Sequence, residues 1–310
     1  EKLKLFEPIS FAGLRVKNRV VMPPMGMGYC HPDGSVSDRV VNYYKQRAAG
    51  GVGMIVVENC IVDPDVLGVG PELNLFEDKF IPGLARVVDA VKPFGSTIGL
   101  QLNHMGRQTT LGKPVAPSPI AISERGPLPR VLNQDDIRYV VDEFVSAARR
   151  GQQAGFEFIE IHGAHGYLIC EFISPLSNRR DDEYGGDADR RLRFPREIVQ
   201  GIRQVCGERF PIQFRISGCE YVPGGLTLAD TTFVSRKLVE FGVASISVSA
   251  GNWQTLKYIM APMFMPVGLL AGDAAQIQQA VSVPVIAVGR IHSADLAENI
   301  LAAGQADIVA

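Results

Sequence analysis

Two histidines and a tyrosine fall within one glycine-rich turn, in the order His162-Gly-Ala-His165-Gly-Tyr167. Imidazole and phenol groups donate hydrogen bonds and transfer protons, so their convergence would serve hydrogen-bonding or acid–base chemistry. His-x-x-His is also compatible with two metal ligands, but catalytic zinc needs a third protein ligand and no obvious Glu or Cys partner follows. In a third interpretation, both histidines are ordinary polar residues of a surface loop.

Short runs rich in valine and isoleucine alternate with segments whose apolar residues have helical spacing. Such alternation indicates parallel βαβ units with right-handed crossovers. An open doubly wound sheet is disfavoured, because Met25-Gly-Met-Gly-Tyr29 lacks the dinucleotide-binding glycine spacing. We therefore predict an α/β fold, a (β/α)8 TIM barrel that ends at its eighth strand. The predicted strands cover residues 19–22, 52–57, 98–102, 156–161, 211–216, 243–248, 284–288 and 306–310, and the predicted helices 80–91, 135–153, 228–241 and 273–281.

The active groups of such a barrel lie at the carboxyl ends of its strands. Arg215 interrupts an otherwise apolar strand, where a buried cation is costly without an anionic partner. A structural ion pair is the alternative role for this arginine. The predicted strand ends carry a polar, hydrogen-bonding set: Pro24-Met25, Glu58-Asn59, Gln101, His162, Arg215, Ser249 and Gly289-Arg290.

Composition excludes several functions. A formal net charge of -2 gives no electrostatic footprint for nucleic acid and no polybasic face for a membrane. No long apolar stretch or signal-peptide pattern is present, and the five cysteines form neither a C-x-x-C pair nor a disulfide framework. We expect a soluble cytoplasmic protein that acts on a small molecule.

The string around His162 resembles the signature of the old yellow enzyme family, and the similarity runs along the whole chain. Six further stretches resemble family motifs in barrel order, and together they support the resemblance more strongly than any one of them would. These stretches are Leu5-Phe-Glu-Pro-Ile9, residues 14–25, Gln101-Leu-Asn-His-Met-Gly-Arg107, Ala116-Pro-Ser118, Phe214-Arg-Ile-Ser217 and Val288-Gly-Arg-Ile291.

This resemblance implies an FMN-dependent ene-reductase, in which reduced flavin gives hydride to the β-carbon of an α,β-unsaturated carbonyl, carboxylate or thioester. His162 and His165 would hydrogen-bond the substrate carbonyl, and Tyr167 would protonate the α-carbon. Arg215 would stabilise negative charge on the reduced flavin. No metal is expected. The implied cofactor contacts are Pro24, Met25, Gly26, Glu58, Gln101, His162 and Arg215, with Gly289 and Arg290 at the phosphate.

Within the family, the chain looks most like the multi-domain branch of 2,4-dienoyl-CoA reductases and enoate reductases. We therefore expect residues 1–310 to form the FMN-binding barrel of a longer chain. Beyond Ala310, that chain would hold a 4Fe-4S cluster and FAD and would take electrons from NADH or NADPH. The barrel would contact those further domains or form a homo-oligomer.

One position departs from the family pattern. Many relatives carry Cys or Thr where this chain has Gly26, so flavin tuning by such a side chain is not expected. The glycine also argues against the amine dehydrogenases, which attach flavin covalently in this region. Amine dehydrogenation and a non-catalytic flavin electron-transfer subunit remain alternatives. The Met-rich and aromatic segment 249–265 would either form a wall of the substrate pocket or pack on the barrel rim.

Overall fold

A computed structural model describes residues 3–68 and 70–310. A parallel bridge from Val20 to Val309 joins the first barrel strand to the last, and the Val309 N–H donates to the Arg19 carbonyl at 3.0 Å. The sheet therefore closes, and the predicted (β/α)8 barrel is confirmed. Within the described ranges, its parallel strands pair side by side in the order β3 (Val21–Met22), β4 (Met54–Ile61), β7 (Thr97–Asn103), β11 (Phe158–Gly163), β12 (Ile212–Ser217), β13 (Ser245–Ser249), β14 (Val285–Ala287) and β15 (Ile308–Val309).

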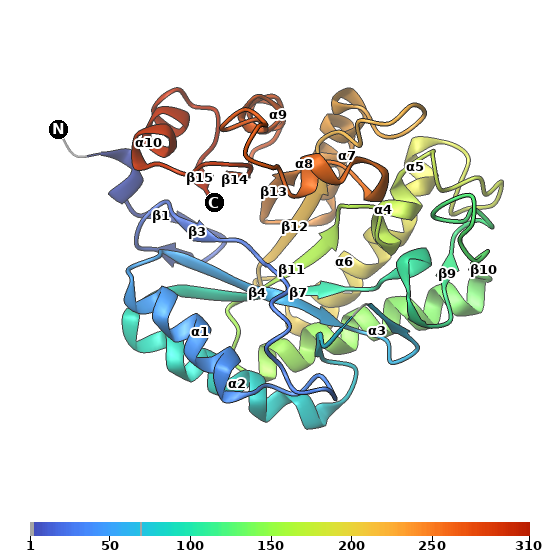
Figure 1. Ribbon diagram of the computed structural model, residues 1–310, viewed down its shortest axis with the longest axis horizontal. Coiled ribbons are helices and arrows are strands. Elements are labelled where there is room, and N and C mark those ends of the chain that lie inside the picture. The colour runs from blue at the N-terminus through green and yellow to red at the C-terminus, as the bar shows by residue number, and fades with distance from the viewer. Residues whose placement is uncertain (1–2, 69) are drawn as a thin grey trace.

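Helices cover the outside of this barrel. Two begin with reciprocal caps, Asn133 with Asp136 and Thr227 with Asp230, which satisfy amides that a helix start leaves unpaired. The covering helices are α1 (Asp38–Ala49), α2 (Ile81–Val91), α3 (Gln134–Gln153), α6 (Arg193–Cys206), α7 (Leu228–Phe241), α9 (Ala271–Gln278) and α10 (Ala294–Ala302). In Figure 1, α1, α2 and α3 lie along one side of the strands, and α9 and α10 lie along the other.

Short elements fill the ends of the barrel and the loops. The longest helix of the described chain is too polar to cross a membrane, and no other described helix meets that requirement. The short elements are η1 (Lys4–Phe6), β1 (Ile9–Phe11), β2 (Leu14–Val16), β5 (Val66–Leu67), β6 (Leu73–Asn74), η2 (Asp78–Phe80), η3 (Lys92–Phe94), η4 (Gly106–Gln108), β8 (Leu111–Gly112), β9 (Val115–Ala116), β10 (Arg130–Val131), α4 (Leu168–Ile173), α5 (Ala188–Arg191), η5 (Trp253–Thr255) and α8 (Leu256–Ile259).

The amino-terminal half of the barrel interior is packed with apolar side chains. The β1–β2 hairpin closes this end, where Leu14 joins the buried cluster that contains Met54 and Phe158. Gly99 makes room for the Phe158 ring, because a Cβ at position 99 would lie 2.3 Å from it. The barrel interior at this end is therefore solid core, and the cavity inside the barrel lies at the carboxyl ends of the strands.

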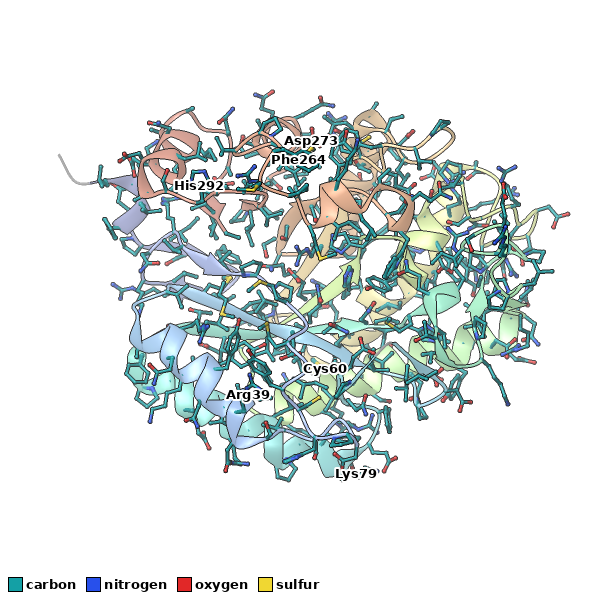
Figure 2. All side chains as sticks on the ribbon, in the orientation of Figure 1. Arg39, Cys60, Lys79, Phe264, Asp273 and His292 are labelled. Atoms are coloured by element: carbon teal, nitrogen blue, oxygen red, sulfur yellow. The ribbon has the colours of Figure 1, made fainter. Side chains whose placement is uncertain are left out.

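Strand β4 contains an irregularity that matters for the site. Val57 pairs with Leu100 and Cys60 pairs with Leu102, so β4 has one residue more than β7 over this interval. Such a bulge breaks the alternation of side chains between the two faces of a strand. Cys60 belongs to the core between the strands and the outer helices, as Figure 2 shows.

Candidate active site

A cavity of about 470 Å³ opens at the carboxyl ends of the strands. The sequence placed eight of its lining residues in the candidate site, and they come from β7, β11, β12 and the loops after β3 and β11. The lining comprises Pro24, Met25, Gly26, Asn59, Gln101, His162, His165, Tyr167, Arg215, Trp253, Leu256, Ile259 and Met260. The predicted Glu58, Gly289 and Arg290 lie outside this lining.

The two histidines and the tyrosine converge as their spacing predicted. The His162 ring lies edge to face with the rings of His165 and Tyr167, at centroid distances of 5.0 and 4.8 Å. The turn that permits this is left-handed at His165 (φ 63°) and Gly166 (φ 74°). Tyr167 then caps α4, so a helix start fixes the direction of the phenol-bearing residue.

Hydrogen bonds orient both imidazoles. Nδ1 of His162 accepts the Ala164 N–H at 3.2 Å, which leaves the proton of the neutral ring on Nε2. Nε2 of His165 bonds the Ser249 hydroxyl at 2.7 Å, and the His165 backbone N–H donates to Ser217 Oγ at 2.9 Å. The neutral His162 ring therefore keeps its Nε2–H as a free donor, and His165 keeps a free Nδ1–H in the tautomer whose Nε2 accepts from the Ser249 hydroxyl.

Burial sets the charge of these groups. It lowers the pKa of His162 well below its ordinary value, and the positive charge of Arg215 adds to that effect. The pKa of His165 is lowered for the same main reason, with His162 and Arg215 contributing. Burial, together with the charge of Glu72, raises the pKa of Tyr167 to about 12. Near neutral pH the pocket therefore presents uncharged imidazoles and a protonated phenol.

Arg215 supplies a buried cation. Its Nη1 donates to the Pro24 carbonyl at 3.4 Å, and among the described residues its buried Nε has no hydrogen-bond partner. Burial lowers the pKa of Arg215, while Glu160 on β11 acts in the opposite direction. A buried guanidinium with an unused donor fits an anionic or carbonyl-bearing ligand in the cavity.

The two phosphate-site predictions have a different setting. Gly289 (φ 106°) and Arg290 (φ 52°) follow β14 in left-handed backbone conformations. The Arg290 guanidinium donates to the carbonyls of Pro262 and Met263 at 3.0 and 2.6 Å, and also to that of Met265. In this conformation the side chain of Arg290 holds the loop between α8 and α9.

Asn59 is a polar pocket residue that the sequence placed at a strand end but did not assign to the cofactor. The β4 bulge sends Asn59 into the cavity, while Glu58 turns toward α1 and accepts from Met27 N at 3.0 Å and Tyr44 Oη at 3.3 Å. Asn59 Nδ2 donates to Glu72 at 3.2 Å. Its Oδ1 lies 3.6 Å from where a Cβ on Gly26 would stand, so Asn59 occupies the space beside that glycine.

The loop after β13 forms the apolar wall of the cavity. Trp253, Leu256, Ile259 and Met260 line it, which agrees with one of the two roles expected for segment 249–265. Further along the same loop, Met263 is 87% exposed and Phe264, labelled in Figure 2, is 78% exposed. As for metals, the described residues contain no cluster of three or more His, Cys, Asp or Glu side chains that could hold an ion.

A closed parallel barrel whose cavity, lined by polar and apolar side chains, opens at its carboxyl ends is typical of (β/α)8-barrel proteins with a ligand site at that face. The chain belongs to the NADH:flavin oxidoreductase / NADH oxidase family, whose model matches residues 4–310. The resemblance to the old yellow enzyme family is thereby confirmed at the level of this family.

Two curated relatives illustrate the range of this family. The NADH oxidase of Thermoanaerobacter brockii is 44% identical over 99% of this chain and 48% of its own length. The NADPH dehydrogenase of Clostridium acetobutylicum is 38% identical over 99% of this chain and 90% of its own length. The chain therefore spans about half of the first relative and most of the second.

Solved structures of related proteins have the same fold as this chain. A 2-naphthoyl-CoA reductase in complex with 2-naphthoyl-CoA superimposes with a TM-score of 0.92, at 26% identity over 99% of this chain and 49% of that one. An old yellow enzyme homologue from Zymomonas mobilis superimposes with a TM-score of 0.85, at 26% identity over 99% of this chain and 88% of that one.

Proposed function

We propose that the cavity binds FMN and that the protein is an NAD(P)H-dependent ene-reductase. Bound FMN would supply the hydride that reduces a C=C bond conjugated to a carbonyl, carboxylate or thioester. The observation that carries the proposal is the convergence of His162, His165 and Tyr167 over a cavity that also holds Arg215. Family membership supports the cofactor.

The residues present fit the isoalloxazine ring of FMN. Arg215 offers an unused buried N–H, and the Gln101 amide lines the same cavity. We assign ring contacts to Pro24, Met25, Gly26 and Gln101, to which the cavity adds Asn59. Gly289 and Arg290 remain candidates for the phosphate, because they follow β14, the seventh barrel strand, and the loops after strands seven and eight of such barrels frequently bind phosphate. Glu58 would support the cofactor site indirectly, because its carboxylate accepts a hydrogen bond from the Met27 backbone N–H next to Gly26.

The histidines are proposed to bind the substrate oxygen. Two neutral N–H donors in fixed orientations stabilise the negative charge that develops on a carbonyl oxygen when hydride adds to the β-carbon. Tyr167, held protonated by its raised pKa, would give its proton to the α-carbon. The apolar wall from Trp253 to Met260 would take the hydrocarbon part of the substrate.

One experiment tests the core of this proposal. Purified protein should show flavin absorbance, and its reduced flavin should be reoxidised anaerobically by some member of a panel of enones, enoates and enoyl-thioesters. Failure of every alkene, with rapid reoxidation by one-electron acceptors, would favour the electron-transfer alternative. Reduction of the flavin by amines would favour amine dehydrogenation, a reaction for which Gly26 offers no attachment thiol.

The larger assembly is also a proposal. We propose that residues 1–310 are the FMN-binding domain of a longer cytoplasmic protein that carries 4Fe-4S and FAD. Two observations support it: relatives about twice as long as this chain, and five cysteines that are all free. Iron content and flavin type in the protein isolated from its source would test it. Native mass would identify a homo-oligomer.

A further inference from the structure

We propose that Glu160 is a positioning residue for the cofactor, because it fixes the orientation of the Gln101 amide and keeps a negative charge beside Arg215. This inference rests on the proposed flavin site. Glu160 is fully buried on β11, does not line the cavity, and has no assigned role in the proposed reaction.

A row of hydrogen bonds passes through Glu160. Its two carboxylate oxygens accept from Gln101 Nε2 at 2.8 Å and from Gln213 Nε2 at 2.5 Å. Oε1 of Gln213 in turn accepts from the Ser245 hydroxyl at 2.9 Å. These residues are register partners on four consecutive barrel strands, β7, β11, β12 and β13. The row therefore runs along four neighbouring strands and meets the cavity at Gln101.

The row has one direction. A carboxylate only accepts hydrogen bonds, so both glutamines must turn their NH₂ groups toward Glu160. Gln101 lines the cavity, and its Oε1 is then the acceptor left for a ligand. The matching ligand edge carries an N–H next to a carbonyl, as the pyrimidine ring of a flavin does. Arg215, two residues beyond Gln213 on the same face of β12, can donate to such a carbonyl.

The same carboxylate also affects charge. Glu160 and Arg215 face the same side of neighbouring strands, since Glu160 pairs with Gln213 and Arg215 is two residues beyond it. Burial raises the pKa of Glu160, while the charge of Arg215 and the hydrogen bonds from Gln213 and Gln101 oppose that rise, and the charge of Glu160 in turn opposes the lowering of the arginine pKa. In a buried site of low dielectric, the negative charge of Glu160 partly cancels the positive electrostatic potential that Arg215 produces at the cavity. With Glu160 ionised, Arg215 therefore favours the negatively charged, reduced flavin less than it would alone. Glu160 is inferred to lower the midpoint potential.

Substitution of the carboxylate separates these effects. Glu160→Gln removes the charge and forces one glutamine amide to turn, so we expect a more positive FMN midpoint potential and about tenfold weaker FMN binding. Glu160→Asp keeps the charge but shortens the reach. It should bind FMN more weakly and keep a potential closer to wild type than to Glu160→Gln. Spectroelectrochemistry and fluorescence titration of the apoprotein give the two values.

Glu220→Gln is the matched control. Glu220 is also a buried carboxylate with several donors, among them Ser174 Oγ and Asn252 Nδ2, but it does not line the cavity. Its substitution should leave the FMN potential unchanged. An unchanged potential in Glu160→Gln, or an equal shift in Glu220→Gln, would overturn the role of Glu160.

A second test needs no variant. Wild-type apoprotein should bind N3-methyl-FMN at least about tenfold more weakly than FMN, because the Gln101 acceptor loses its N–H partner. Equal binding of the two flavins would reject the inferred amide orientation and leave the proposed flavin site intact. Failure to bind FMN at all would reject both proposals.

Discussion

The rings of His162 and Tyr167 lie 4.8 Å apart at an interplanar angle of 75°. Because His162 belongs to strand β11 and Tyr167 caps the following helix, the two groups approach the cavity from different backbone directions. A ligand held by the imidazole is therefore within the reach of the phenol. This relationship separates the two proposed roles, hydrogen-bond donor and proton donor.

Replacement of Tyr167 by Phe removes the proposed acid and little else. We expect flavin reoxidation by an enone to slow by roughly 10²–10⁴-fold, with flavin reduction by NAD(P)H unchanged. Anaerobic stopped-flow absorbance separates the two half-reactions. Tyr184→Phe is the control, because Tyr184 bonds Glu197 and lies outside the cavity lining. Full reoxidation rate in Tyr167→Phe would contradict the assignment.

The histidines can be tested by keeping or removing their donor. His162→Ala and His165→Ala should each reduce kcat by about 10²–10³-fold, since each removes one N–H from the substrate oxygen. His162→Asn should lose less, because the amide retains an N–H. Steady-state kinetics on one enone gives the comparison, and equal losses in the Ala and Asn variants would argue against a donor role.

The apolar wall predicts a size-dependent effect. Met260→Ala should raise KM for bulky aromatic enones by about tenfold and leave small enones nearly unaffected, since one thioether contact is worth about 1 kcal/mol or more. Met263, three residues later, is exposed and does not line the cavity, so Met263→Ala should change neither value. A similar KM change in both variants would show that the loop as a whole is responsible.

Glu171 predicts a pH dependence of stability. Burial raises the pKa of this carboxyl to about 8, although Arg107 opposes the rise. A carboxyl whose pKa is higher in the folded state stabilises the fold below its unfolded pKa near ~4.3, and that contribution is lost as pH rises through 8.

The free energy of unfolding of wild type relative to Glu171→Gln should therefore fall between pH 5 and 8 by on the order of a few kcal/mol and level off above pH 9. Urea denaturation across this range measures the difference. A difference that does not change with pH would mean that the folded-state pKa is not raised.

Two glycines at the site should respond oppositely to alanine. Gly26→Ala should fold normally, because the new Cβ would meet Asn59 Oδ1 at an ordinary 3.6 Å. Gly163→Ala would bring a Cβ to 2.2 Å from the Phe214 ring and should lower the free energy of unfolding by about 1–3 kcal/mol. Urea denaturation midpoints compare the stabilities of the two variants, and equal stability would be inconsistent with this packing.

Most of the barrel could be predicted because its strands are buried on both faces and its helices have one apolar face. The ends of the predicted helices 80–91, 135–153 and 228–241 agree with α2, α3 and α7 to within one residue. Helix α6 was not predicted, although its apolar positions, such as Phe194, Ile198 and Ile202, have helical spacing. The sequence of residues 193–206 therefore did contain the pattern that predicts a helix.

The site was harder to predict at two places. Asn59 was placed at the strand end but not among the cofactor contacts, because regular alternation would direct Glu58 into the barrel and a bulge leaves no clear pattern in a single sequence. The contacts of Arg290 with the carbonyls of residues 262–265 depend on a loop distant in sequence, which local patterns cannot reveal.

The β4 bulge has a consequence for how this protein can evolve. It gives two adjacent residues different environments. Glu58 accepts hydrogen bonds from Tyr44 and the Met27 backbone, whereas Asn59 faces the cavity. Position 59 can therefore change in polarity without disturbing the packing that position 58 secures. Natural variation within this pair should be unequal, with new chemistry acquired at residue 59 and the carboxylate of residue 58 retained.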